Sequence, residues 1–268
     1  MFQHFQNTFG PPATHYNQFL LSEIQSERFD VVLVRPRNPL NIGAAARAMA
    51  NFGFSRLSVV APFAPTWREA RSAVDCQDVL VNARESATLG EAVADATLVA
   101  GTGSLQFRKP EQRVVRLPEL GPLVSGELER GGRVALVFGP EKHGLTRDDL
   151  SWCHVLVEIP TDPRQPSMNL GQAVAVCLYE LAARVHSAGV TSGPEPVESG
   201  RLELLARVVE EAMEAAGHRP RAIEAANRRE LRLLLRRLSL SAHDTRRILG
   251  VFRRILWRLR NGAAGSHE

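Results

Sequence analysis

Three short apolar runs constrain the fold of this chain more than any other feature of its sequence. They lie at Val31–Val34, Val134–Phe138 and Val155–Ile159. Each run is continuous rather than alternating, which is typical of strands that are covered on both faces. Stretches of strong helix formers, at Asn41–Phe52 and Asn169–His186, follow the first and the last run. This alternation predicts an α/β fold, with a parallel sheet and helices on both of its faces.

Small and polar residues follow each of these runs. The segments are Asn41–Arg47 (NIGAAAR), Gly139–Leu145 (GPEKHGL) and Pro166–Leu170 (PSMNL). A weaker signal of the same kind, Gly101–Ser104, follows a predicted strand at Thr97–Ala100. Because ligands of open α/β sheets bind at the carboxyl ends of the strands, the sequence predicts a binding site there.

Arg47 stands alone in a helical segment that is otherwise rich in alanine. Since Ala44 and Ala48 suit tight packing, the Arg47 side chain is expected to point away from the core. Its guanidinium either binds a ligand at the mouth of a cleft or forms a surface salt bridge, and spacing alone does not decide between these two roles. Asn41 is interpreted as the N-cap of this helix.

The glycines at 139 and 144 have the spacing of a phosphate-binding P-loop, but the next residue is Leu145 and not lysine. Without that cation the segment does not predict a nucleoside triphosphatase. The glycines are expected to allow close approach of the backbone to a ligand. Glu141 is expected to accept backbone hydrogen bonds that hold the loop.

In this order the segments resemble the motifs of the SPOUT class of RNA methyltransferases, and within it the SpoU/TrmH family. The resemblance spans about residues 30–185 and includes each fixed position of Asn-x-Gly-x-x-x-Arg, at Asn41, Gly43 and Arg47. It implies S-adenosylmethionine as the cofactor, a SPOUT fold with a C-terminal trefoil knot, a homodimer, and methylation of an RNA ribose 2′-hydroxyl.

The resemblance also implies roles for individual residues. A guanidinium has no free lone pair at neutral pH, so Arg47 is expected to position the ribose-phosphate and to stabilise negative charge rather than act as a base. Ser167 is expected to face the reacting centre or to cap the following helix, or both. The implied catalytic residues are Asn41, Arg47, Ser167 and Asn169. The implied cofactor contacts are Thr102, Gly103, Ser104, Gly139, Ile159, Pro166, Ser167 and Met168.

Positive charge is concentrated near the C-terminus. Residues 201–260 carry 15 arginines and 7 acidic residues, so their net charge is +8, while the rest of the chain sums to −4. Periodic leucines predict three helices in this segment. A polyanionic partner such as RNA is favoured over the alternative, a solvated arginine-rich surface.

These patterns divide the chain into a flexible leader (1–28), a SPOUT methyltransferase domain (29–188), a linker (189–200) and a basic helical RNA-binding extension (201–260). The extension resembles that of TrmJ-type tRNA methyltransferases. It implies tRNA as the partner and nucleotide 32 of the anticodon loop, a cytidine or uridine, as the target. An rRNA 2′-O-methyltransferase and a catalytically silent RNA-binding protein stay open as alternatives.

Several other classes find no support. Three cysteines without C-x-x-C spacing suit a reducing cytoplasm and predict neither disulfides nor a zinc site. His143, His154 and His186 have no partner at metal-ligand spacing, so no metal is expected. The sequence has no apolar stretch of bilayer length and no secretion-signal pattern, and no membrane association is expected.

Overall fold

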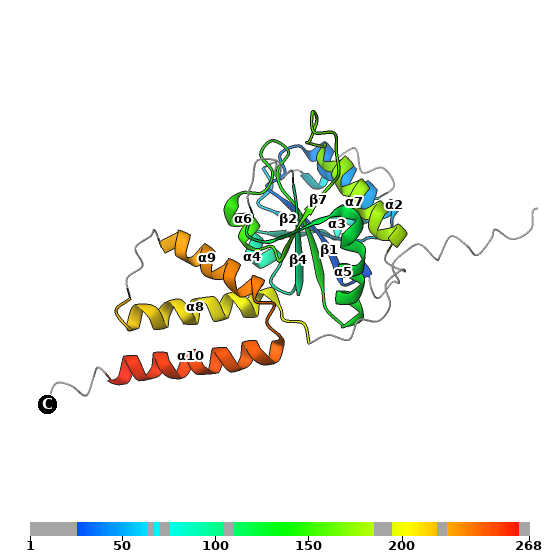
Figure 1. Cartoon of the computed structure of the whole chain (residues 1–268). Helices are drawn as coiled ribbons and strands as arrows, with labels where there is room; N and C mark the ends of the chain where they lie inside the picture. The colour runs from blue at the N-terminus through cyan, green and yellow to red at the C-terminus, as the bar shows by residue number, and fades with distance from the viewer. Residues whose placement is uncertain are drawn as a thin grey trace, which may run out of the picture.

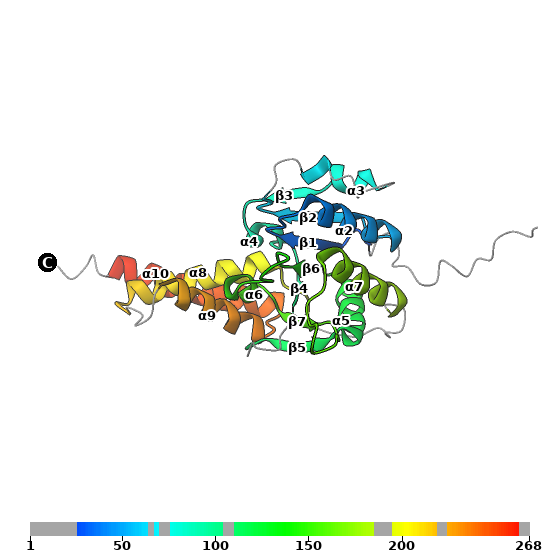
Figure 2. The ribbon, with the colours of Figure 1, turned by 90° about the horizontal axis from the view of Figure 1, so that it is seen from above.

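The structure, a computed structural model, describes residues 26–63, 67–69, 76–103, 110–184, 195–218 and 224–262. Within these residues one seven-stranded sheet has the order β3-β2-β1-β6-β4-β7-β5, and every pair of neighbours is parallel (Figure 2). The strands are β1 (Phe29–Val34), β2 (Arg56–Val60), β3 (Arg84–Ser86), β4 (Leu98–Thr102), β5 (Arg113–Arg116), β6 (Val134–Phe138) and β7 (Val155–Glu158). The predicted parallel α/β sheet is confirmed.

Helices cover both faces of this sheet. Figure 2 shows α2, α5 and α7 on one side, and α4 and α6 on the other side, where α8 to α10 also lie. The helices are α2 (Pro39–Asn51), α3 (Gln77–Val81), α4 (Leu89–Ala92), α5 (Leu117–Glu129), α6 (Arg147–Ser151), α7 (Leu170–Arg184), α8 (Ser199–Ala215), α9 (Glu224–Arg237) and α10 (Ala242–Gly262), with a 3₁₀ turn at Trp67–Glu69.

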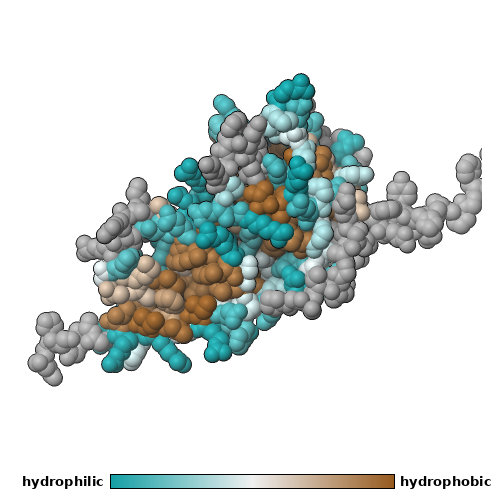
Figure 3. Space-filling model, in the orientation of Figure 1, coloured by the Kyte–Doolittle hydropathy of each residue, from teal (hydrophilic) through white to brown (hydrophobic). Residues whose placement is uncertain are grey.

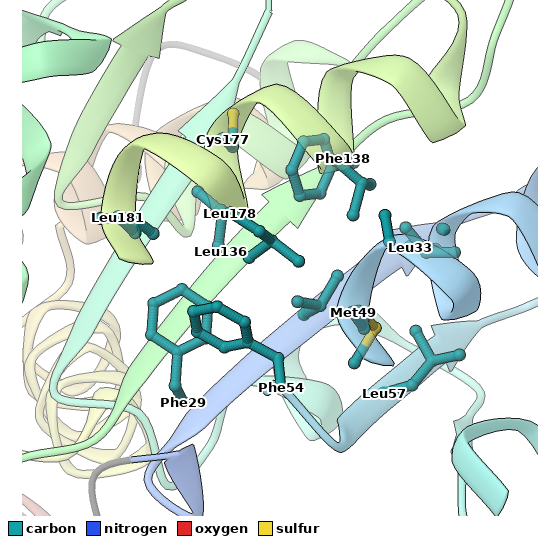
Figure 4. Close-up of a cluster of buried hydrophobic side chains, with 14 of the residues drawn as sticks. Phe29, Leu33, Met49, Phe54, Leu57, Leu136, Phe138, Cys177, Leu178 and Leu181 are labelled. Atoms are coloured by element: carbon teal, nitrogen blue, oxygen red, sulfur yellow. The ribbon is translucent and has the colours of Figure 1, made fainter. Parts of the chain in front are cut away.

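Two hydrophobic cores explain why the central strands are continuously apolar. In β1, Val31 and Leu33 join the core under α2 and α7, whereas Val32 and Val34 join the core under α4 and α6. Successive side chains of a strand point to opposite faces, so a strand between two cores needs apolar residues throughout. Figure 4 shows the first core, in which Phe29 packs edge-on against Phe54 with ring centroids 4.9 Å apart.

Helix α2 begins earlier than expected. Asn38, and not Asn41, is its N-cap: the Asn38 side chain accepts a hydrogen bond from the Leu40 N–H at 3.0 Å. Pro39 occupies the first turn, where its fixed backbone angle and missing N–H suit a helix start. The assignment of Asn41 as the cap is therefore wrong, and its side chain is available for contacts outside α2.

The C-terminal helices pack directly on the sheet domain (Figure 1). Helix α8 begins at Ser199, where the backbone N–H groups of Ser199 and Gly200 donate to the carbonyls of Ala96 and Ala94 at 2.8 and 2.9 Å. Helix α9 contacts α6, and α10 contacts α8. Residues 1–25 of the expected leader and 189–194 of the expected linker lie outside the described residues.

The three cysteines, Cys76, Cys153 and Cys177, are free and buried. Burial raises the pKa of Cys153 and of Cys177 to about 12, so both groups stay protonated at neutral pH. Among the helices of the described residues, none combines the length and the apolar character needed to cross a bilayer.

His154 makes the stability of the fold depend on pH. Its Nδ1 accepts a hydrogen bond from the Val99 N–H at 3.0 Å, and burial, with a smaller contribution from Arg236, lowers its pKa from 6.5 to about 3. The unfolded chain therefore binds the proton first as the pH falls. We expect the unfolding free energy to drop by up to about 1.4 kcal/mol per pH unit between pH 6.5 and 3.

Chemical denaturation across this pH range measures that slope. His154→Asn keeps a hydrogen-bond acceptor near the Val99 N–H, but its side chain does not titrate. The slope of its unfolding free energy against pH should therefore be smaller than that of the unmodified chain by the contribution of one proton. Equal slopes in the two proteins would show that His154 is not the group responsible.

Candidate active site

A cavity of about 490 Å³ opens at the carboxyl ends of β4, β6 and β7. Its volume lies within the range of about 300–1,000 Å³ typical of small-molecule sites. Phe138, Leu145 and Leu170 give it apolar walls, and Glu141 and Lys142 add charges. Of the predicted cofactor contacts, those in its lining are Thr102, Gly103, Gly139, Ile159, Pro166, Ser167 and Met168, while Ser104 lies outside the described residues.

A chain of side-chain hydrogen bonds joins the three motif segments beside this cavity. The Asn169 Nδ2 donates to the Asn41 Oδ1 at 2.9 Å, and the Asn41 Nδ2 donates to the Glu141 Oε1 at 2.9 Å. The three residues come from the first turn of α2, from the loop after β6 and from the start of α7. Asn41 is 100 residues from Glu141 and 128 residues from Asn169 in the sequence, so the network joins distant segments of the chain.

Glu141 fixes the loop after β1 as well. Its two carboxylate oxygens accept hydrogen bonds from the backbone N–H groups of Arg37 and Asn38, each at 3.2 Å. The expectation that Glu141 accepts backbone hydrogen bonds is confirmed. Although burial raises its pKa, the hydrogen bonds from Asn41 and from backbone N–H groups outweigh burial and lower the pKa. Glu141 is therefore an anion at neutral pH that connects two loops.

Asn169 has two roles in one side chain. Its Oδ1 accepts hydrogen bonds from the backbone N–H groups of Gly171 and Gln172 at 2.9 and 3.4 Å, which caps α7. Its Nδ2 donates the hydrogen bond to the Asn41 Oδ1. The interpretation of Ser167 as the cap is wrong, because α7 begins at Leu170 and Ser167 lies two residues before the cap position, which Asn169 occupies. Ser167 is exposed and lines the cavity.

Gly139 lies where no larger residue fits. A Cβ atom at this position would lie 2.3 Å from the backbone carbon of Gly144 and 2.3 Å from the backbone nitrogen of Leu145. Gly144 itself has a positive φ of 62°, a left-handed conformation that favours glycine. The two glycines allow the loop to fold back on itself, and its backbone forms part of the cavity wall.

Arg47 stands apart from the cavity. It is exposed on α2, as expected, and no described side chain forms a salt bridge with it. Helix α2 approaches α7 closely where Ala44 faces Gly171, since a Cβ on Gly171 would lie 2.7 Å from the Ala44 Cβ. Arg47 is not in the cavity lining, so the structure separates it from the predicted cofactor contacts.

Two charged lining residues were not anticipated from the sequence. Arg116 ends β5 and Glu158 ends β7, and they are register partners at the edge of the cavity. Both follow the pattern of a polar residue at a strand end, but β5 has no long apolar run that would identify it as a strand. The described residues contain no cluster of histidine, cysteine, aspartate or glutamate suited to a metal ion.

The chain is similar in sequence to TrmJ methyltransferases and similar in structure to one of them. The TrmJ tRNA (cytidine/uridine/adenosine-2′-O-)-methyltransferase of Pseudomonas aeruginosa is 41% identical over 156 residues, or 58% of this chain and 60% of that protein. The tRNA (cytidine/uridine-2′-O-)-methyltransferase TrmJ of Pectobacterium atrosepticum is 34% identical over 233 residues, or 84% of this chain and 94% of that protein. The crystal structure of TrmJ from Z. mobilis superposes with a TM-score of 0.74 at 32% identity and covers 84% of this chain and 98% of that one.

The extent of these matches differs. The chain matches only 60% of the length of the P. aeruginosa protein and 66% of the TrmJ of Methanocaldococcus jannaschii. The model of the SpoU rRNA Methylase family matches residues 28–179, close to the span of the motif resemblance. Since this match covers more than half of the chain, the protein belongs to the SpoU rRNA methylase family.

Proposed function

We propose that this protein is an S-adenosylmethionine-dependent tRNA ribose 2′-O-methyltransferase. The observation that carries the proposal is the Asn169–Asn41–Glu141 network, which joins all three family motifs beside one cavity. Glu141 lines this cavity, whereas Asn41 and Asn169 are not among its lining residues. The TrmJ relatives support tRNA and the ribose 2′-oxygen as the substrate and the site of methylation.

The cavity fits the proposed cofactor. Phe138 and Leu170 offer apolar walls for a purine, and the tight turn at Gly139 also lines the cavity. We assign the cofactor contacts to Thr102, Gly103, Ser104, Gly139, Ile159, Pro166, Ser167 and Met168. S-adenosylmethionine would supply an electrophilic methyl group there.

The protein's own residues would orient the acceptor ribose. Ser167 is exposed at the cavity, and Asn41 and Asn169 share a hydrogen bond beside it. Arg47 lies outside the lining, so we assign it to the RNA: its guanidinium holds the ribose-phosphate and stabilises the charge that develops on the 2′-oxygen. Fixed positioning of this kind supplies most of the rate, and no metal or covalent step is required.

We further propose nucleotide 32 of the anticodon loop, a cytidine or uridine, as the target. The proposal includes a methyltransferase domain at 29–188 with the family's trefoil knot, a linker at 189–200 and an RNA-binding extension at 201–260. It also includes a homodimer and a cytoplasmic location. The exposed Val176 and Tyr179 on α7 support a dimer face, and three free cysteines support a reducing compartment.

Mass-spectrometric mapping of 2′-O-methylated nucleotides tests this function. The purified chain is incubated with isotope-labelled S-adenosylmethionine and total RNA from a strain that lacks the modification. We expect label at one tRNA ribose, in the anticodon loop. Label in rRNA alone would support the rRNA alternative, and cofactor binding without any transfer would support a silent RNA-binding protein.

A further inference from the structure

Most arginines of the C-terminal helices do not face solvent as free charges. Six of them form salt bridges with carboxylates at 2.8 to 3.4 Å. The pairs are Arg201–Glu198, Arg228–Glu210, Arg232–Glu203, Arg237–Glu111, Arg246–Glu195 and Arg260–Glu211. Three of these carboxylates, Glu111, Glu195 and Glu198, lie outside residues 201–260 and are not counted in the net charge of that segment. The net charge of +8 therefore overstates the positive charge that this region presents to a polyanion.

Two arginines of α9 are committed to the interface with the sheet domain. Arg232 and Arg236 are only 6% and 3% exposed, and their guanidinium carbons lie 3.9 and 5.2 Å from the ring centre of Trp152. Arg232 also donates to the Ser151 Oγ, and Arg236 to the Ser199 Oγ, each at 2.8 Å. These groups hold α9 on the sheet domain and are not available to an external ligand.

The second half of α10 presents a different surface, which we call the α10 patch: Arg253, Arg254, Trp257 and Arg258. All four residues are exposed, and Trp257 is 64% exposed. In the described part of the chain, no carboxylate forms a salt bridge with any of the three arginines. The spacings of three and four residues make Trp257 a neighbour of Arg253 and Arg254 on the helix surface, and Arg258 a neighbour of Arg254.

Free arginines elsewhere on these helices are scattered. Arg207, Arg229 and Arg247 also lack a salt bridge among the described residues, but each lies on a different helix. The α10 patch is therefore where unpaired charge and an exposed aromatic ring coincide. Figure 3 shows apolar surface over the C-terminal helices, edged by hydrophilic side chains.

We propose that the α10 patch binds RNA through an unpaired nucleotide, an inference that rests on the proposed function. The three guanidiniums contact backbone phosphates, and the Trp257 indole stacks on a base. Stacking on an aromatic side chain needs a base whose face is accessible, so the ligand is a single-stranded or loop segment rather than a continuous duplex. Three unpaired positive charges also disfavour direct contact of this patch with the same patch on a second copy of the chain.

A pair of matched triple variants tests the phosphate contacts. Arg253→Gln/Arg254→Gln/Arg258→Gln removes the free arginines, and Arg228→Gln/Arg246→Gln/Arg260→Gln removes three paired ones from α9 and α10 with the same change in charge. Binding of an unmodified tRNA transcript to the full chain is measured over a range of salt concentrations. The first triple should reduce the slope of log affinity against log salt by about 2 to 3, and the second by less than about 1.

Trp257 is tested through its own fluorescence and by two replacements. Trp257→Ala should weaken tRNA binding about 5- to 100-fold, and Trp257→Phe, which keeps an aromatic face, should restore most of it. Quenching of tryptophan fluorescence by tRNA should be lost in Trp257→Phe. A fully paired RNA duplex should bind equally to the original chain and to Trp257→Ala.

The outcomes separate this inference from the proposed function. If the original chain methylates tRNA but the two triple variants lose affinity and salt slope equally, the α10 patch is not the RNA contact and the inference fails while the function stands. The inference also fails, while the function stands, if the first triple variant binds tRNA as the original chain does. The same holds if the α10 patch binds an acidic protein in place of RNA. If the original chain neither binds nor methylates tRNA, both ideas fail.

Discussion

An Arg47→Ala variant is expected to transfer methyl groups about 10²- to 10³-fold more slowly than the original chain, with unchanged affinity for S-adenosylmethionine. The size of the effect is that of removing one preorganised group that stabilises developing charge. Affinity should not change because Arg47 does not line the cavity. Initial rates on a tRNA transcript and calorimetry with the cofactor measure the two quantities separately.

Arg56→Ala is the matched control for this experiment. This substitution also removes one guanidinium from the surface. Arg56 lies at the amino end of β2, at the opposite end of the sheet from the cavity, and forms a salt bridge with Asp30 at 3.0 Å. The rate of methyl transfer by Arg56→Ala should change little, since an exposed salt bridge contributes at most about 1 kcal/mol to the stability of the fold. Full activity of Arg47→Ala would mean that Arg47 is an ordinary surface residue, whereas loss of cofactor affinity would place it in the cavity wall.

Gly139→Ala is expected to weaken cofactor binding about 10- to 100-fold. The added Cβ would overlap backbone atoms of Gly144 and Leu145 at 2.3 Å, and backbone atoms cannot turn aside as a flexible side chain can. The loop after β6 must move, and overpacking of this kind costs about 1 to 3 kcal/mol. Calorimetric titration of the variant with S-adenosylmethionine or its demethylated product measures the loss.

Two other glycine-to-alanine variants serve as controls for Gly139→Ala. Gly250→Ala on α10 has open space for the methyl group and lies away from the cavity, so binding should be unaffected. Gly103→Ala has open space as well but lines the cavity, so a loss of affinity there would place the ligand beside Gly103. Normal affinity in Gly139→Ala would mean that the turn after β6 is not part of the binding site.

The central strands could be predicted from the sequence, and the edge strands could not. The run Val134–Phe138 has the bounds of β6, because burial on both faces demands apolar residues throughout. At the sheet edges, β3 consists of Arg84, Glu85 and Ser86, and β5 begins and ends with arginine. Charged residues protect an open edge against pairing with other chains, and they also remove the pattern by which a strand is recognised.

The motif segments were found from the sequence, but the way in which they connect was not. Spacing along the chain cannot reveal that Asn41 donates to Glu141 while it accepts from Asn169. The position of the helix cap had to be known first, since Asn41 is available for these bonds only because Asn38 caps α2. Spacing also cannot show which of the arginines near the C-terminus are paired, because several of their carboxylate partners lie in distant segments.

The pairing of β1 with β6 has a consequence for the time course of folding. Along one edge of β1, Phe29 pairs with Val134 of β6. Along the other edge of β1, Val31 pairs with Leu57 of β2. A ribosome that adds about 5 to 20 residues per second completes β2 within seconds of β1, but needs roughly 5 to 20 s to deliver β6. One edge of β1 stays open throughout that interval. Closing so long a loop is also entropically slow. The nascent chain must therefore avoid association through that edge before the cavity at the carboxyl ends of β4, β6 and β7 can form.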